Sequence, residues 1–142
     1  MTDIKKIGLG TMRMNLSNAK MSVETIHYAL DQGITLFNTG EIYLGEESEL
    51  VVRQALNGIP RDKYFLSVKS DVLPKLVGGI YGPDIKPFHV KAYLDYFIHK
   101  SMHRLGIDYI DLYQLAQMDE TVPIPCPCSN AFCDKECIAL FP

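Results

Sequence analysis

Tyr43 and Lys69 each follow a strand-like run of apolar residues, 34–37 in one case and 65–68 in the other. A third such segment, residues 109–116, ends in the same manner. Side chains at the carboxyl ends of parallel strands often carry acid–base chemistry. An ammonium beside a phenol stabilises the phenolate and makes the phenol a better proton donor. The spacing therefore predicts a proton-donating site in which Lys69 activates Tyr43.

Each of these side chains also has an ordinary structural interpretation. A tyrosine after a strand commonly packs at the rim of a sheet, and a single lysine is commonly solvated. Asn38 lies between the apolar run 34–37 and Tyr43, and asparagine is also a residue type that forms turns. The chemical interpretation depends on whether the fold brings Tyr43 and Lys69 together.

The elements that must position these residues follow from the hydrophobic periodicity. Strands are predicted at 7–12, 34–37, 64–68 and 109–115, and helices from about residue 22 to 33, from 49 to 56 and from 88 to 105. We interpret Ser22 as the first helix cap, with Met21 and Ile26 as a hydrophobic staple. Gly33 and Gly106 are expected to end their helices. Residues 70–87 are predicted to form a long loop.

Strands that alternate with helices in this way predict an α/β fold with a parallel sheet and right-handed crossovers. The alternation alone fits either a doubly wound sheet or part of a (β/α)₈ barrel. Gly8 and Gly10 are followed by Thr11, Met12 and Arg13, so the third glycine of a dinucleotide-binding GxGxxG motif is missing. A Rossmann fold is therefore disfavoured.

Composition excludes several classes of function. The chain has 142 residues, of which 47% are hydrophobic and 22% charged, as expected for one globular domain. The net charge is −3 without a basic cluster, which argues against nucleic acid as a partner. No apolar run approaches the ~20 residues of a membrane span. The start, Met1 to Lys6, lacks the apolar segment of a signal peptide, so we expect a cytoplasmic protein.

Asp95, His99 and His103 lie at positions i, i+4 and i+8, a spacing that can hold a metal on one helix face. The apolar positions 90, 94, 97 and 105 define a different face of the same helix. We favour a solvent-exposed face for the histidines and predict no metal site there.

All four cysteines, Cys126, Cys128, Cys133 and Cys137, lie after Ile124. Their C-x-C-x₄-C-x₃-C spacing lacks the paired knuckles of a zinc site, and disulfides are disfavoured in the cytosol. We interpret residues 125–142 as a Cys/Pro-rich tail that is foreign to the domain and disordered. The role of the cysteines is left open.

The sequence resembles the aldo-keto reductases over roughly residues 4–124. The order and spacing of several short motifs carry the resemblance: Gly8 to Met12, Ala29 to Ile34, Glu41 to Tyr43, Gly45 to Glu49, Leu66 to Lys69, Arg104 to Leu115, and Val122 to Ile124. The resemblance implies the N-terminal half of a (β/α)₈ TIM barrel that binds NADPH without a Rossmann domain. Gly10, Thr11, Met12 and Asn38 would then contact the cofactor.

Matched residue by residue, the family's catalytic tetrad of Asp, Tyr, Lys and His falls on Asn38, Tyr43, Lys69 and Ala116. Asn38 and Ala116 differ from the Asp and His of the tetrad, and the fungal pyridoxal reductase branch is similar to this sequence at both positions. Asn38 would hold Lys69 through an amide hydrogen bond and leave its charge less compensated than an aspartate would. Ala116 would remove a hydrogen-bond donor and open space for a bulky aldehyde such as pyridoxal.

A complete barrel needs about 250 residues, so the resemblance implies a truncated domain over residues 1–124. We therefore expect an NADPH-dependent aldehyde reductase by ancestry, although this chain alone is expected to be inactive. The alternative is a non-catalytic half-barrel that self-associates or pairs with another chain. An open half-barrel exposes strand edges and apolar surface, which favours such association.

Overall fold

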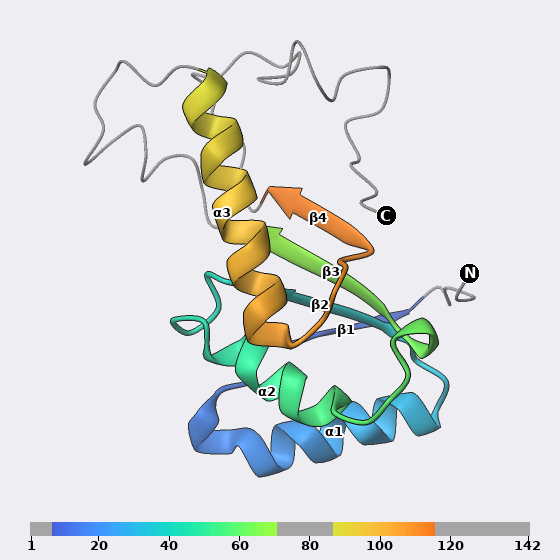
Figure 1. Cartoon of the computed structure of the whole chain (residues 1–142). Helices are drawn as coiled ribbons and strands as arrows, with labels where there is room; N and C mark the ends of the chain where they lie inside the picture. The colour runs from blue at the N-terminus through green and yellow to red at the C-terminus, as the bar shows by residue number, and fades with distance from the viewer. Residues whose placement is uncertain (1–6, 71–86, 116–142) are drawn as a thin grey trace.

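The computed structural model describes residues 7–70 and 87–115. Within these residues, four parallel strands form one sheet in the order β1-β2-β3-β4 (Figure 1). The strands are β1 (Gly8–Gly10), β2 (Leu36–Gly40), β3 (Phe65–Ser70) and β4 (Leu112–Leu115). The helices are α1 (Ala19–Asp31), α2 (Glu47–Leu56) and α3 (Pro87–Leu105), with short 3-10 turns η1 (Leu16–Asn18) and η2 (Arg61–Lys63).

The strand order distinguishes between the two architectures that the sequence allows. In a doubly wound sheet the order reverses at a switch point, whereas here it follows the chain in one direction. The helices also follow one another in chain order along the sheet, with α2 in contact with both α1 and α3 (Figure 1). The described residues therefore form part of a (β/α) barrel, which confirms the predicted fold class.

The core lies between the helices and one face of the sheet. Phe37 of β2, Leu66 and Val68 of β3, and Ile26 of α1 are all fully buried there. Burial of one such side chain contributes about 1.5–3 kcal/mol to stability. Because side chains alternate along a strand, Asn38 and Lys69 lie on the opposite face, which is the inner side of a barrel.

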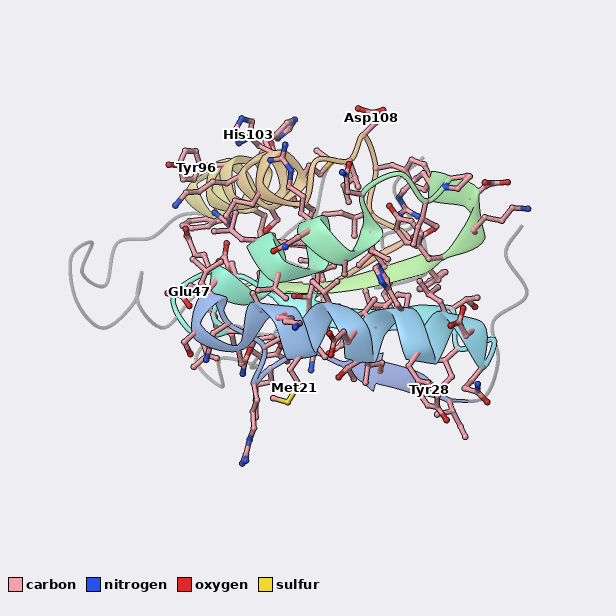
Figure 2. All side chains as sticks on the ribbon, turned by 90° about the horizontal axis from the view of Figure 1, so that it is seen from below. Met21, Tyr28, Glu47, Tyr96, His103 and Asp108 are labelled. Atoms are coloured by element: carbon pink, nitrogen blue, oxygen red, sulfur yellow. The ribbon has the colours of Figure 1, made fainter. Side chains whose placement is uncertain are left out.

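The start of α1 differs from the prediction. The helix begins at Ala19, directly after η1, so its N-cap position is Asn18 rather than Ser22. Asn15 and Asn18 form a capping box at the start of η1. Ser22 lies inside the helix, where its hydroxyl donates to Asn18 Oδ1 at 2.7 Å. Met21 is 63% exposed and points away from the helix, so the predicted staple does not form (Figure 2).

The strand boundaries were also predicted too early for β2 and β3. These strands begin at Leu36 and Phe65 and continue through Gly40 and Ser70, so Asn38 and Lys69 lie inside strands. β1 and β4 are shorter than the predicted segments 7–12 and 109–115. The helix ends were predicted correctly: Gly33 and Gly106 have φ values of 74° and 69°, where glycine is preferred.

Several predictions lie outside the described residues. These are the loop at 71–86, Ala116, the tail at 125–142 with its four cysteines, and the N-terminal residues 1–6. Among the helices that the structure describes, none is both long and apolar enough to cross a membrane.

Candidate active site

The structure brings Tyr43 and Lys69 together. Lys69 Nζ donates a hydrogen bond of 3.1 Å to the phenol oxygen of Tyr43, and the same nitrogen lies 5.8 Å from the centre of the Tyr43 ring. Tyr43 is 8% exposed, while Lys69 is half-buried on the inner face of β3. A phenol that accepts a hydrogen bond from an ammonium is the arrangement expected of a proton donor and its activator.

The close approach of β2 to β3 supports this contact. Gly40, the last residue of β2, is the register partner of Lys69. A Cβ at position 40 would lie 3.0 Å from the Lys69 carbonyl oxygen and 3.1 Å from Lys69 Cβ. A larger residue at position 40 would therefore push the two strands apart at the point where Lys69 is held.

Tyr43 belongs to a tight loop that joins β2 to α2, which we call the Tyr43 loop and define as residues 41–46. The Tyr43 amide donates to the Gly40 carbonyl at 3.0 Å, and the Glu46 amide donates to the Tyr43 carbonyl at 3.1 Å. Leu44, Gly45 and Glu46 have φ values of 50°, 67° and 76°. The loop therefore turns back on itself through three consecutive left-handed residues, and this turn directs Tyr43 toward β3.

Asn38 does not bind Lys69 in the manner expected from the sequence. Its Nδ2 donates to Ser67 Oγ at 2.9 Å, and Ser67 Oγ donates to Gln114 Oε1 at 2.7 Å. This ladder of three side chains crosses β2, β3 and β4 on the inner face of the sheet. The prediction that the Asn38 amide positions Lys69 is therefore wrong in its partner, because Ser67 is the register partner of Asn38.

The segment expected to contact the cofactor follows β1. A Cβ at Gly10 would meet no atom within 4 Å, and Met12 is 55% exposed, so both positions are accessible. Thr11 is instead fully buried. Its hydroxyl donates to the Asn38 carbonyl at 3.2 Å and lies 2.7 Å from Ser48 Oγ. Thr11 therefore holds the backbone of this segment in place, and its side chain is not accessible to a ligand.

A buried ionic cluster lies behind the Tyr43 loop. Arg104 of α3 is 8% exposed and forms ion pairs with Glu41, Glu46 and Glu49. Burial raises the pKa of Glu49 above its ordinary value, although the hydrogen bond and charge of Arg104 oppose this shift. This cluster was not predicted from the sequence. The sequence offered one indication of it: the charged residue Arg104 lies between Ser101 and Leu105, which are both on the buried face of α3.

His99 and His103 of α3 face solvent, as predicted. His99 and His103 are exposed, and Figure 2 shows His103 pointing away from the sheet. His99 Nδ1 lies 2.6 Å from the backbone oxygen of Asp95, which is a contact within the helix. Across residues 7–70 and 87–115, no three His, Cys, Asp or Glu side chains are grouped in a way that could hold a metal.

The family model of the aldo/keto reductases matches residues 6–138 of this chain. The match runs past residue 124, and the domain boundary predicted there stays a prediction. Among curated proteins, the chain is 30% identical over 127 residues to "Probable aldo-keto reductase 1" of Glycine max. It is 34% identical over 128 residues to "Aldo-keto reductase YhdN" of Bacillus subtilis (strain 168). Each alignment covers 86% of this chain, but only 35% and 37% of the relatives, so the chain spans about a third of their length.

Solved structures agree with this result. An aldo-keto reductase from Klebsiella pneumoniae in complex with NADPH superposes with a TM-score of 0.64 at 29% identity. That alignment covers 82% of this chain and 37% of the other. The holo form of aldo-keto reductase AKR11C1 from Bacillus halodurans gives a TM-score of 0.63 at 29% identity, over 79% of this chain and 36% of the other.

Proposed function

Because this chain belongs to the aldo/keto reductase family, we propose that it provides the proton-donating half of an NADPH-dependent aldehyde reductase site. The observation that carries the proposal is the 3.1 Å hydrogen bond from Lys69 to the phenol oxygen of Tyr43. Tyr43 is the proton donor and Lys69 is its activator.

The residues at this end of the sheet fit a bound cofactor. Gly10 and Met12 leave an accessible surface after β1, and Asn38 lies beside them on the inner face of β2. We assign NADPH to this surface, with Gly10, Met12 and Asn38 as its contacts and Thr11 as a support for the backbone. The NADPH and NADP complexes of the Klebsiella pneumoniae relatives support this assignment.

When bound, NADPH supplies the hydride that converts the aldehyde carbon to an alcohol carbon. Tyr43 transfers its phenolic proton to the carbonyl oxygen, and the Lys69 ammonium stabilises the phenolate that remains. Solvent then returns a proton to Tyr43. Because Tyr43 is buried and Lys69 is half-buried, this charge interaction is less screened than it would be on the surface.

For the substrate we propose an aromatic aldehyde of the pyridoxal type. The support is the pair of departures from the family tetrad, Asn38 and Ala116. An alanine at position 116 supplies no donor for the carbonyl oxygen, so a substrate with its own phenol and ring nitrogen is favoured. The cytoplasmic location expected from the sequence belongs to the same proposal.

The test begins with the 142-residue chain and a titration of NADPH followed by its fluorescence. Saturable binding by the chain supports the cofactor assignment. Turnover is then measured as aldehyde-dependent oxidation of NADPH by a full-length homologue, because the chain alone is expected to be inactive. Tyr43→Phe should lower turnover by about 100-fold or more and leave NADPH affinity within about twofold. Tyr96→Phe is the matched control, because Tyr96 is 61% exposed on α3 and points away from the sheet (Figure 2).

Two outcomes would count against the proposal. If the Tyr43→Phe variant turned over aldehyde as fast as the wild type, Tyr43 would not be the proton donor. A folded chain that binds no NADPH would instead favour the alternative of a half-barrel that associates with itself or with another chain. Size-exclusion chromatography of the same sample would detect that association.

A further inference from the structure

We propose that Arg104 is a positioning residue that holds the Tyr43 loop in the conformation that brings the phenol to Lys69. The proposal rests on the function assigned above, since it concerns how the proton donor is placed. It makes a structural claim that can be tested without cofactor or aldehyde.

The backbone of the Tyr43 loop has little preference of its own for the observed turn. Leu44 and Glu46 adopt φ values of 50° and 76°, which residues other than glycine rarely adopt. Such a conformation persists where the surrounding structure imposes it. Interactions outside the loop must therefore hold it.

Apolar packing contributes little to holding the Tyr43 loop in this conformation. Ile42 and Leu44 are 38% and 48% exposed, so the two residues that flank Tyr43 are only partly buried. Only Tyr43 itself, at 8% exposure, buries a large apolar surface in the middle of the loop. The hydrogen bond from the Glu41 amide to the Lys69 carbonyl, at 3.3 Å, fixes the start of the loop only, so the end of the loop needs a second anchor.

Arg104 contacts both ends of the loop. Its Nη2 lies 3.8 Å from Glu41 Oε2 at the start of the loop, and its Nη1 lies 3.2 Å from Glu46 Oε1 at the end. Its Nε donates to Glu49 Oε2 in the first turn of α2. One planar guanidinium thus joins the two ends of the loop to the helix that follows it.

The guanidinium is itself held in place. Arg104 Nη2 lies 3.3 Å from Ser101 Oγ on the same helix, and both residues are buried. Lys100 also pairs with Glu46, at 2.9 Å, but its side chain is 41% exposed and the pair secures one end of the loop only. A lysine at position 104 would place its charge on one nitrogen, whereas the three guanidinium nitrogens each lie near a different carboxylate.

A natural control lies at the other end of the sheet. Arg61 of η2 also pairs with a carboxylate, Asp111, and both side chains are 17% exposed. Arg61 further contacts the backbone oxygens of Tyr64 and Tyr109 at 2.9 Å and 3.0 Å. It precedes β3 and so lies far from Tyr43, at the amino ends of the strands. Its replacement should destabilise the chain without moving the phenol.

The experiment uses the 142-residue chain labelled with 3-fluorotyrosine and observed by fluorine NMR. Tyr43→Phe identifies the Tyr43 resonance, and Lys69→Met gives its position when the lysine contact is lost. We expect Arg104→Lys to move the Tyr43 resonance most of the way to the Lys69→Met position. Arg61→Lys should lower the melting temperature and leave that resonance in place.

Glu46→Gln tests the proposal in a variant that is expected to fold, because the Glu46 side chain is 36% exposed. It should shift the Tyr43 resonance in the same direction as Arg104→Lys, by a smaller amount. The proposal is overturned if Tyr43 keeps its wild-type resonance in both variants. It is equally overturned if Arg61→Lys moves the resonance as far as Arg104→Lys does. Either result stands whether or not the chain reduces aldehydes.

Discussion

Lys69 of β3 reaches the phenol oxygen of Tyr43 at 3.1 Å, although 26 residues separate them in the sequence. The register of the parallel strands explains this contact. Gly40 lies opposite Lys69, so Tyr43 begins only three residues beyond the partner of the lysine. The hydrogen bond from the Glu41 amide to the Lys69 carbonyl, at 3.3 Å, holds the start of the loop against β3, and the left-handed turn at Leu44 to Glu46 leads the chain back to α2.

Lys69→Met should reduce aldehyde turnover in a full-length homologue by about 100-fold, because the phenolate of Tyr43 would lose its stabilising charge. Stability should change by less than about 0.5 kcal/mol, since Lys69 is only half-buried. Steady-state kinetics and thermal unfolding would measure the two effects. Lys63→Met, an exposed lysine in η2, is the control and should alter neither quantity. Equal loss of activity in both variants would exclude a specific role for Lys69.

Ala116→His should lower turnover of pyridoxal in a full-length homologue by about tenfold, because an imidazole would fill the space proposed for the substrate ring. A small aliphatic aldehyde, which does not need that space, serves as the control substrate and should lose less. The ratio of kcat/KM values for the two aldehydes is the measured quantity. An unchanged ratio would show that the space argument for position 116 is wrong.

Ser48→Ala should destabilise the chain by about 1–3 kcal/mol, because buried partners would lose their hydrogen bonds. Ser48 Oγ donates to the Thr11 carbonyl at 2.9 Å, and it lies 2.7 Å from Thr11 Oγ1 and 3.2 Å from Thr39 Oγ1. Urea unfolding followed by circular dichroism would measure the loss. Ser17→Ala removes an exposed hydroxyl and should cost less than about 0.5 kcal/mol. A similar cost for both would mean that the Ser48 bonds add no net stability.

Glu49→Gln should flatten the pH dependence of stability. Burial raises the folded-state pKa of Glu49 above its ordinary value of 4.5. Between 4.5 and that raised pKa, the folded chain binds more protons at Glu49 than the unfolded chain does. The contribution of Glu49 to stability is therefore complete below 4.5 and is lost as pH rises through the folded pKa.

Unfolding free energies of wild type and Glu49→Gln, measured across this pH range, would check the prediction. The variant should lose less stability than the wild type as pH rises. The groups that face Glu49 are Arg104, Ser101 and Glu46, and they are unchanged in the variant. Glu24→Gln on the exposed side of α1 provides the control and should keep the wild-type slope. Parallel curves for wild type and Glu49→Gln would contradict the prediction.

Much of the fold could be predicted because it depends on local patterns. Apolar runs identified the strands, and Gly33 and Gly106 marked helix ends, since only glycine readily adopts their positive φ values. The boundaries of β2 and β3 could not be placed in this way. Asn38 and Lys69 remain inside strands although they are polar, because they lie on the inner face of the sheet and need no apolar partner.

The start of α1 shows a second limit. Asn15, Asn18 and Ser22 are all residue types that cap helices, and the sequence alone does not rank them. Asn15 and Asn18 exchange hydrogen bonds that cap η1, and α1 follows directly with Asn18 at its N-cap position, while Ser22 lies inside α1 and is buried. The 3-10 turn η1 therefore places the start of the helix before Ser22.

The sequence by itself determined that Tyr43 and Lys69 lie at the same edge of the sheet, because each lies at the carboxyl end of a parallel strand. Only the tertiary structure decided what holds them there. Asn38 binds Ser67 because strand register makes them neighbours. Arg104 reaches Glu49 across 55 residues because α3 packs on α2. Such contacts depend on distances between separate elements, and residue spacing along the chain does not predict those distances.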